Sequence, residues 1–339
     1  MSDPHIARRA GRSHPPSLLK LAERSIHDDR LLRRGDTVLC ACSGGPDSTA
    51  LLHVLALLQK RLGHRVVGLG VDHGLRPEAP AELAIAADLA ASLDVPFTLA
   101  RVAVTPGSNL QARARAARLT ALWDAAKDAG ARGVATGHTA DDRAETFLLR
   151  LLRGAGPRGL AVLPPRAPFP PPTALLDPPA ALDGLDDLTS DPIAPRDPAE
   201  PELIRPLLRA RRSDIAAHLD RHRLAFASDP SNLNPRFTRV RVRRELLPLL
   251  EDLSPKIVEH LSALADMLAA EPPSAGASPS KLPAIGLGRA QRQAIERAER
   301  LGRASVEIGV SGDRSLVATF PDGRIVLTKS GTTGPRRGR

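Results

Sequence analysis

The sequence predicts an α/β protein with a doubly wound parallel sheet, a smaller helical domain and a short β-rich C-terminal segment. From Leu31 to about Leu163, short apolar runs alternate with longer helical ones. Strands separated by helical crossovers of this length pair in parallel. From about Leu203 the apolar spacing becomes helical, and the end of the chain alternates like a strand pair. With 339 residues, the chain is long enough for one large or two medium domains.

The first domain, 31–163, is predicted to contain four strands, each followed by a helix. The strand and helix ranges are 36–42 and 48–62, 66–71 and 79–93, 97–102 and 111–129, and 133–136 and 141–152. In sheets of this kind, ligands bind at the carboxyl ends of the strands. Residues that directly follow a strand are therefore the first candidates for a functional site.

The remaining segments are predicted from composition. Residues 1–30 form an extension with a helix, and 164–202 is a proline-rich, acidic and mobile insertion. A helical domain covers 203–270 and a linker 271–283. The segment 284–330 contains a strand pair with a turn at Pro321–Asp322–Gly323, and 331–339 is a basic tail.

Composition bounds the function classes. The chain has 48 Lys and Arg against 38 Asp and Glu, and its net charge of +10 favours a polyanion such as nucleic acid as partner, although a GC-rich genome would explain part of it. Cys40 and Cys42, the two cysteines, lie in a predicted strand and cannot complete a four-ligand zinc site. With no signal peptide or membrane span visible, we expect a cytoplasmic protein.

A glycine turn follows the first predicted strand. Its residues are Ser43, Gly44, Gly45, Pro46, Asp47 and Ser48. The glycines let the backbone N–H groups curl around an anion, the helix that follows adds its positive dipole end, and Asp47 would hold Mg²⁺ against phosphates. The alternative is an ordinary strand–helix turn with a Ser/Asp cap.

Two carboxylates begin the fourth helix. Asp142 and Glu145 are three residues apart and share a helical face, which suits a cationic amino group near the strand ends. The alternative is that acids in the first helical turn complement the helix dipole, with Thr139 as the cap. His73, Gly137 and His138 also follow strands and are candidates for nucleotide contact, although a buried, hydrogen-bonded histidine is the commoner role.

Arginines form two further groups. Arg115 and Arg118 share a helical face and would stabilise charge on phosphates or touch RNA; for Arg113 a solvated face is as good an explanation. A basic run contains Arg236, Arg239, Arg241, Arg243 and Arg244. It predicts a nucleic-acid backbone contact, against the alternative of an exposed helix start.

These motifs carry a resemblance. The turn at 43–48 matches the SGGxDS signature of the PP-loop ATP pyrophosphatases, which cleave ATP between its α- and β-phosphates. The segments 71–76, 109–118, 137–146, 151–156, 204–208, 229–232 and 239–248 together resemble the tRNA(Ile)-lysidine synthetases. The departures are Leu119 in place of a usual tyrosine, Val240 in place of a usual asparagine, the acidic insertion and a shorter C-terminal region.

The resemblance implies an adenine nucleotide hydrolase-like fold and an enzyme that uses ATP and Mg²⁺. It implies ligation of free L-lysine to C2 of the wobble cytidine of tRNA(Ile) with the CAU anticodon, through an adenylated tRNA. Asp47, Arg115 and Arg118 would be catalytic, Asp142 and Glu145 would bind lysine, and the basic run would bind tRNA. A homodimer is left open. The alternatives are a PP-loop tRNA thiolase, which commonly carries extra cysteine pairs, and a non-catalytic RNA-binding protein on this fold.

Overall fold

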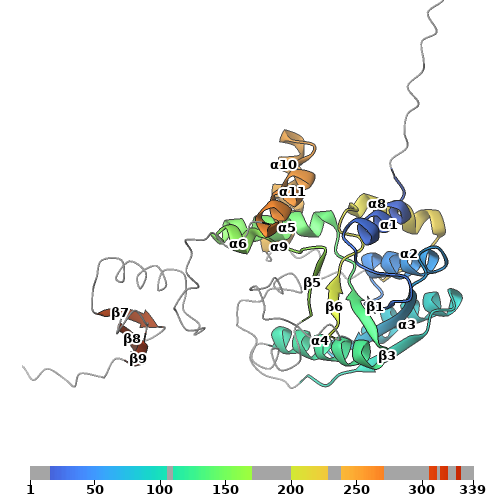
Figure 1. Ribbon diagram of the computed structural model, residues 1–339, viewed down its shortest axis with the longest axis horizontal. Helices are drawn as coiled ribbons and strands as arrows, with labels where there is room; N and C mark the ends of the chain where they lie inside the picture. Colours follow the sequence, from blue (N-terminus) through green and yellow to red (C-terminus); the bar gives the residue numbers. More distant parts are fainter. Residues whose placement is uncertain are drawn as a thin grey trace, which may run out of the picture. The chain divides into compact units, whose positions relative to one another are not determined.

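A computed structural model describes residues 16–104, 110–169, 200–227, 238–270, 305–310, 314–319 and 326–329 (Figure 1). The chain divides into two units, 1–270 and 271–339. Each is described by itself.

The first unit is built on a six-stranded sheet with the order β3-β2-β1-β4-β6-β5. Its strands are β1 (Thr37–Cys42), β2 (Arg65–Asp72), β3 (Phe97–Arg101), β4 (Ala131–Ala135), β5 (Arg166–Pro168) and β6 (Glu202–Ile204). All neighbours pair in parallel except β5, which runs antiparallel to β6. The predicted parallel α/β fold is therefore confirmed.

Helices cover both faces of this sheet. The helices α1 (Leu18–Asp28), α2 (Pro46–Leu62), α3 (Ala79–Ser92) and α8 (Arg212–His222) share one core with Val38 and Cys40 of β1. The helix α4 (Leu110–Asp128) packs on the other face, where Leu39 of β1 points. The alternation of β1 side chains follows from the two-residue repeat of a strand, and it explains why this strand is apolar throughout.

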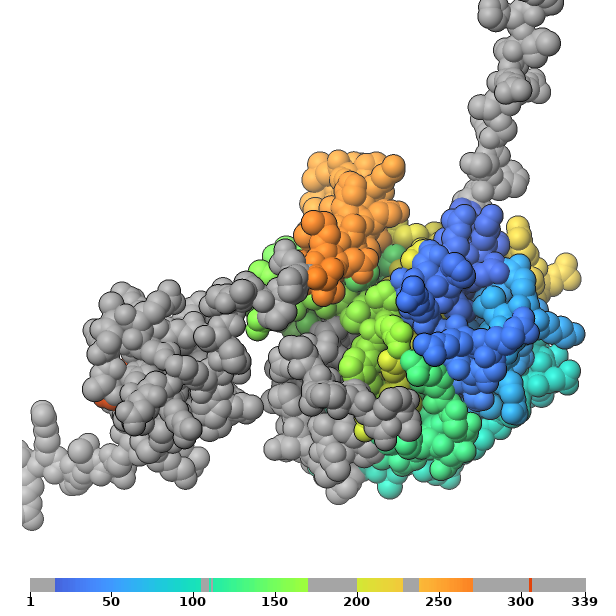
Figure 2. All heavy atoms as spheres, viewed as in Figure 1, coloured from blue at the N-terminus to red at the C-terminus, as the bar shows by residue number. Residues whose placement is uncertain are grey.

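The other described helices of the first unit form a layer around α5 (Ala140–Leu152). They are α6 (Pro157–Leu160), α9 (Thr238–Arg241), the π-helical turn η3 (Val242–Leu246), α10 (Leu247–Leu253) and α11 (Ile257–Ala270). Ala144 and Leu148 of α5 pack against Val242 and Val258. Helices α10 and α11 stand out from the surface in Figure 2. Among the described residues, no helix is long and apolar enough to cross a membrane.

The two ends of the predicted insertion belong to the sheet, which corrects the boundaries 164 and 202. Residues 166–168 form β5 and residues 202–204 form β6, and Pro168 pairs with Glu202. Phe169 and Leu203 are fully buried. Strands of three residues carry too little periodicity to be recognised in a proline-rich context. The stretch between, 170–199, lies outside the described residues.

The second unit contains an antiparallel sheet of three described strands where the sequence predicted two. They are β7 (Ser305–Val310), β8 (Arg314–Thr319) and β9 (Val326–Lys329), in that order. The predicted turn at 321–323, the linker and the basic tail lie outside the described residues, as does the extension before residue 16.

Candidate active site

The glycine turn connects β1 to α2, as predicted. The hydroxyl of Ser48 lies 3.2 Å from both the backbone nitrogen and the hydroxyl of Ser43, and it donates to the carbonyl of Gly45 at 3.1 Å. Pro46 and Asp47 occupy the first turn of α2, where proline fits because its missing N–H would have no helical partner. The turn is thus closed by its own serines.

Two glycines are required by close backbone approach. Gly44 has φ +79°, and a Cβ there would lie 2.2 Å from the carbonyl oxygen of Glu82. A Cβ at Gly137, after β4, would lie 2.9 Å from the backbone carbonyl of Asp47. Neither position tolerates a side chain without backbone movement. The first contact places the turn after β1 against α3, and the second places the loop after β4 against the start of α2.

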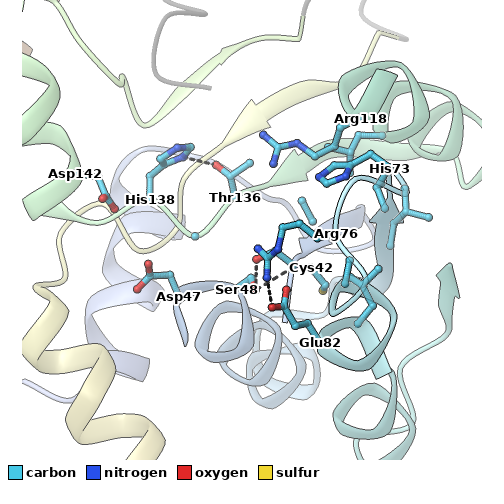
Figure 3. A pocket seen from close by; sticks show the side chains of 18 of the residues that line it. Cys42, Asp47, Ser48, His73, Arg76, Glu82, Arg118, Thr136, His138 and Asp142 are labelled. Atoms are coloured by element: carbon cyan, nitrogen blue, oxygen red, sulfur yellow. Dashed lines mark hydrogen bonds and ion pairs between the residues drawn. The ribbon is translucent and has the colours of Figure 1, made fainter. Parts of the chain in front are cut away.

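A cavity of about 550 Å³ opens beside the turn. Such a volume falls within the range of about 300–1,000 Å³ typical of small-molecule sites. Asp47, His138 and Asp142 lie on one side of it, and His73, Arg76 and Arg118 lie on the other (Figure 3). Its apolar part is lined by Ala41, Leu69, Val71, Ala79, Leu83 and Leu122.

The cavity lies at the carboxyl ends of β1, β2 and β4. Ser43 follows β1, His73 follows β2, and Gly137 and His138 follow β4. The sheet order places β2 and β4 on either side of β1, so the cavity sits where the strand order reverses. Nδ1 of His138 lies 2.8 Å from the hydroxyl of Thr136, and Arg118 reaches the cavity while Arg115 is not among its lining residues.

Asp47 carries a perturbed carboxyl group. Burial raises its pKa to about 6, and the charge of Asp142 adds to the increase, against the opposing effects of Arg212, Arg243 and His138. A cavity-facing carboxylate whose charge is disfavoured in this way gains from a bound cation.

Asp142 caps α5 and also pairs with an arginine. One oxygen accepts the backbone N–H and the hydroxyl of Thr139, both at 2.8 Å, which completes a capping box. The other oxygen pairs with Arg212. Burial opposes the charged form, but Arg212, His138 and Arg239 leave the pKa of Asp142 below its usual value.

Glu145 is fully buried and lies among three guanidinium groups. Its oxygens accept from Nε of Arg243 at 2.7 Å, from Nε of Arg239 at 3.2 Å and from Arg212. A buried carboxylate requires such partners. Asp142 and Glu145 form the acid–arginine cluster with Arg212, Arg239 and Arg243, and Asp142 and Arg239 line the cavity. Whether Asp142 and Glu145 bind lysine stays a prediction.

Arg211 and Arg212, at the start of α8, are partners that the sequence argument missed. Arg211 donates to Asp141 at 2.8 Å, and the backbone N–H of Arg212 donates to the same carboxylate, also at 2.8 Å. A pair of arginines before an amphipathic helix was the available signal. Because the two arginines lie about 70 residues from α5 in sequence, the sequence alone did not connect them with the α5 acids.

The basic run is divided by the structure. Arg239 and Arg243 turn inward to Glu145, whereas Arg241 is exposed and pairs with Glu245 at 2.8 Å. Arg244 is also exposed. Arg236 lies outside the described residues. The tRNA-binding role of this run stays a prediction, and Arg241 and Arg244 are its exposed members among the described residues.

The fold and the glycine turn define the class: the family described as PP-loop domain matches residues 18–250. Among solved structures, the U34-tRNA thiolase NcsA of Methanococcus maripaludis, with its 4Fe–4S cluster, has a TM-score of 0.56 at 12% identity. The match covers 75% of this chain and 78% of that one. This likeness concerns the fold alone.

The particular family follows from curated relatives. The tRNA(Ile)-lysidine synthase of Thermobifida fusca is 35% identical over 355 residues, covering 97% of this chain and 96% of that protein. The chain therefore belongs to the tRNA(Ile)-lysidine synthase family, and the resemblance of its motifs is confirmed. The enzyme of Rhodopseudomonas palustris is 42% identical over 216 residues. The chain spans about half the length of some relatives, with 54% of that protein and 45% of the one from Symbiobacterium thermophilum.

Proposed function

We propose that this chain ligates free lysine to C2 of the wobble cytidine of tRNA(Ile) with the CAU anticodon, converting ATP to AMP and pyrophosphate. The observation that carries the proposal is a single cavity shared by the PP-loop turn and by Asp142, which belongs to the acid–arginine cluster. The family and its relative of similar length supply the substrate class.

ATP is the first substrate, since a PP-loop domain implies ATP binding. The glycine turn and the amino terminus of α2 would hold its phosphates, because backbone N–H groups and the helix dipole both favour an anion there. The apolar lining of the cavity, including Leu69 and Leu83, would take the adenine ring. Arg118 would neutralise charge on the phosphates.

Asp47 is the residue that would hold Mg²⁺. Its carboxylate borders the cavity next to the glycine turn, and burial and the charge of Asp142 disfavour its ionised form. An oxygen ligand in this position suits a hard divalent cation. When bound, the ion would offset the charge that develops when pyrophosphate leaves.

The chemistry is two displacements in sequence. First, the C2 oxygen of cytidine attacks the α-phosphorus of ATP; its bond to phosphorus forms as the bond to pyrophosphate breaks. Then a deprotonated amino group of lysine attacks C2, and the C2–oxygen bond breaks with departure of AMP. The residues of this chain would bind and orient the three substrates at this cavity.

The acid–arginine cluster suits a zwitterion. Asp142 would bind an ammonium group of lysine, and Arg212 or Arg239 would bind its carboxylate. Because Arg212 already pairs with Asp142, the amino acid would share this carboxylate with the guanidinium or displace it. The site would discriminate among amino acids by the distance between the ammonium group held by Asp142 and the carboxylate held by the arginine.

The proposal is tested by incubating the full chain with ATP, labelled lysine and a tRNA(Ile) transcript with the CAU anticodon. Label should appear in the RNA only when ATP is present, and AMP should form in equal amount. The matched control is the same transcript with uridine at the wobble position, which should take up no label. Label in both transcripts, or in neither while ATP is turned over, would show that the substrate assignment is wrong.

The thiolase alternative is not favoured by the cysteines. Cys40 and Cys42 both lie in β1, and their sulfur atoms are 3.8 Å apart. Cys40 is fully buried, and its hydrogen bond with Cys42 and its burial raise the pKa of its thiol. A protonated thiol is a poor nucleophile and a poor cluster ligand.

A further inference from the structure

Three histidines meet where α2 packs against α8. His53 lies on α2, and His218 and His222 lie four residues apart on α8, which puts them on one helical face. One ring nitrogen from each lies within 4.8 Å of the other two. Nδ1 of His53 and Nε2 of His218 are 2.9 Å apart. None of the three lines the cavity described above.

The surroundings suit a metal ligand set. His53 and His218 are buried, and His222 is exposed. Burial lowers the pKa of His53 and of His218 to about 4; His222 contributes to both shifts, and His53 and Arg221 contribute to that of His218. Both rings are therefore neutral near pH 7, the form that offers a lone pair.

A plain packing cluster is the alternative. The ring centroids are 4.5 to 5.0 Å apart, as in T-shaped or tilted pairs. The hydrogen bond between His53 and His218 accounts for two of the rings. Packing sets no orientation for the ring nitrogens, whereas here one nitrogen of His222 lies within 4.8 Å of a nitrogen of each of the other two rings.

We propose that His53, His218 and His222 bind one divalent transition metal ion of the zinc class, with the fourth position open to water. Imidazole nitrogens suit Zn²⁺, Co²⁺, Ni²⁺ or Cu²⁺ and disfavour Mg²⁺. Tetrahedral zinc with bonds of about 2.0–2.1 Å places ligand nitrogens about 3.3 Å apart. The ring nitrogens of His53 and His218, which are 2.9 Å apart, would have to separate by a few tenths of an ångström. A ring nitrogen of the exposed His222 would supply the third ligand.

Such an ion would fasten α8 to α2. The amino-terminal end of α8 carries Arg211 and Arg212, which contact Asp141 and Asp142, and α2 carries Asp47. The ion would therefore brace the arginines of the acid–arginine cluster from the opposite end of their helix. This role does not depend on the identity of the substrates.

The test is a metal titration of the untagged full chain after treatment with EDTA and removal of the chelator. Co²⁺ should bind with one-to-one stoichiometry and give the visible absorption of a four-coordinate site, and Zn²⁺ should abolish that absorption. Millimolar Mg²⁺ should leave it unchanged. His222→Ala should weaken Co²⁺ binding by at least about 100-fold, since loss of a direct ligand exceeds the cost of losing an outer-shell partner.

His260→Ala is the matched control, because His260 is an exposed histidine on α11. It should bind Co²⁺ like the wild type. Zn²⁺ should also raise the unfolding temperature of the wild type and of His260→Ala, but not of His222→Ala. Absence of one-to-one binding in the wild type, or equal affinity in His222→Ala, would overturn the proposal and leave a packing cluster.

Discussion

Asp47→Asn should make the protein more stable while it abolishes ATP cleavage. The pKa of Asp47 is raised from 3.8 to about 6, mainly by burial and then by Asp142. Each pKa unit corresponds to about 1.4 kcal/mol, which gives about 3 kcal/mol as an upper bound. The side chain is only partly buried, so solvent screening reduces the expected gain to about 1–2 kcal/mol.

The sign follows from proton linkage. Because the folded state holds this proton more tightly than the unfolded state, the carboxyl group favours folding below pH 3.8, and that contribution is lost as the pH rises through about 6. The gain in the free energy of unfolding of Asp47→Asn over the wild type should therefore grow between about pH 4 and pH 6 and stay constant at higher pH. It corresponds to a rise of about 2–8 °C in unfolding temperature.

The assay is thermal unfolding from pH 4 to pH 8 without nucleotide or Mg²⁺, paired with AMP formation at pH 7.5. Asp88→Asn, at an exposed acid of α3, is the matched control and should show no such pH-dependent gain. A stability difference that does not change with pH would refute the electrostatic reasoning. Normal AMP formation in the variant would remove Asp47 from the site.

Three further changes separate the parts of the proposed site. Replacing residues 170–199 with a short Gly/Ser linker should change lysine incorporation by only a few-fold, because β5 and β6 already pair at Pro168 and Glu202; a stable variant unable to cleave ATP would contradict this. Changing Arg241 and Arg244 together to Gln should weaken tRNA binding and flatten its salt slope by about one per side chain, with ATP binding as the unchanged control. Asp142→Asn should raise the lysine concentration for half-maximal turnover about ten- to hundredfold, with tRNA adenylation retained; an unchanged lysine dependence would exclude this residue from the pocket.

The first domain was predictable because its signals are local. The eight described elements from β1 to α5 begin and end within two residues of the predicted bounds. Their apolar periodicity is strong, and Gly, Pro and Asp mark the turns. The three-residue strands β5 and β6 lack that periodicity, so the sheet was predicted to end one strand pair too early.

The contacts of the site were less predictable because they depend on tertiary pairing. The sequence placed Asp47, His138 and Asp142 at strand ends, and the structure gathers them around one cavity. The sequence could not show that Arg239 and Arg243 turn inward to Glu145. An arginine-rich helix start has the same sequence pattern whether its side chains face solvent or a buried acid.

The helix-capping explanation and the ligand-binding explanation of the α5 acids concern different oxygen atoms of Asp142. Asp142 caps the helix with one oxygen and meets Arg212 with the other, so its position alone cannot decide between structure and function. Glu145 lies beyond the capping positions and is 0% exposed. A buried carboxylate there is costly unless arginines surround it, and those arginines come from α8, α9 and η3. A purely structural account would have to explain why an apolar residue does not occupy that position instead. That an arginine-paired carboxylate stands there supports the proposal that the acid–arginine cluster at the cavity edge binds a charged ligand.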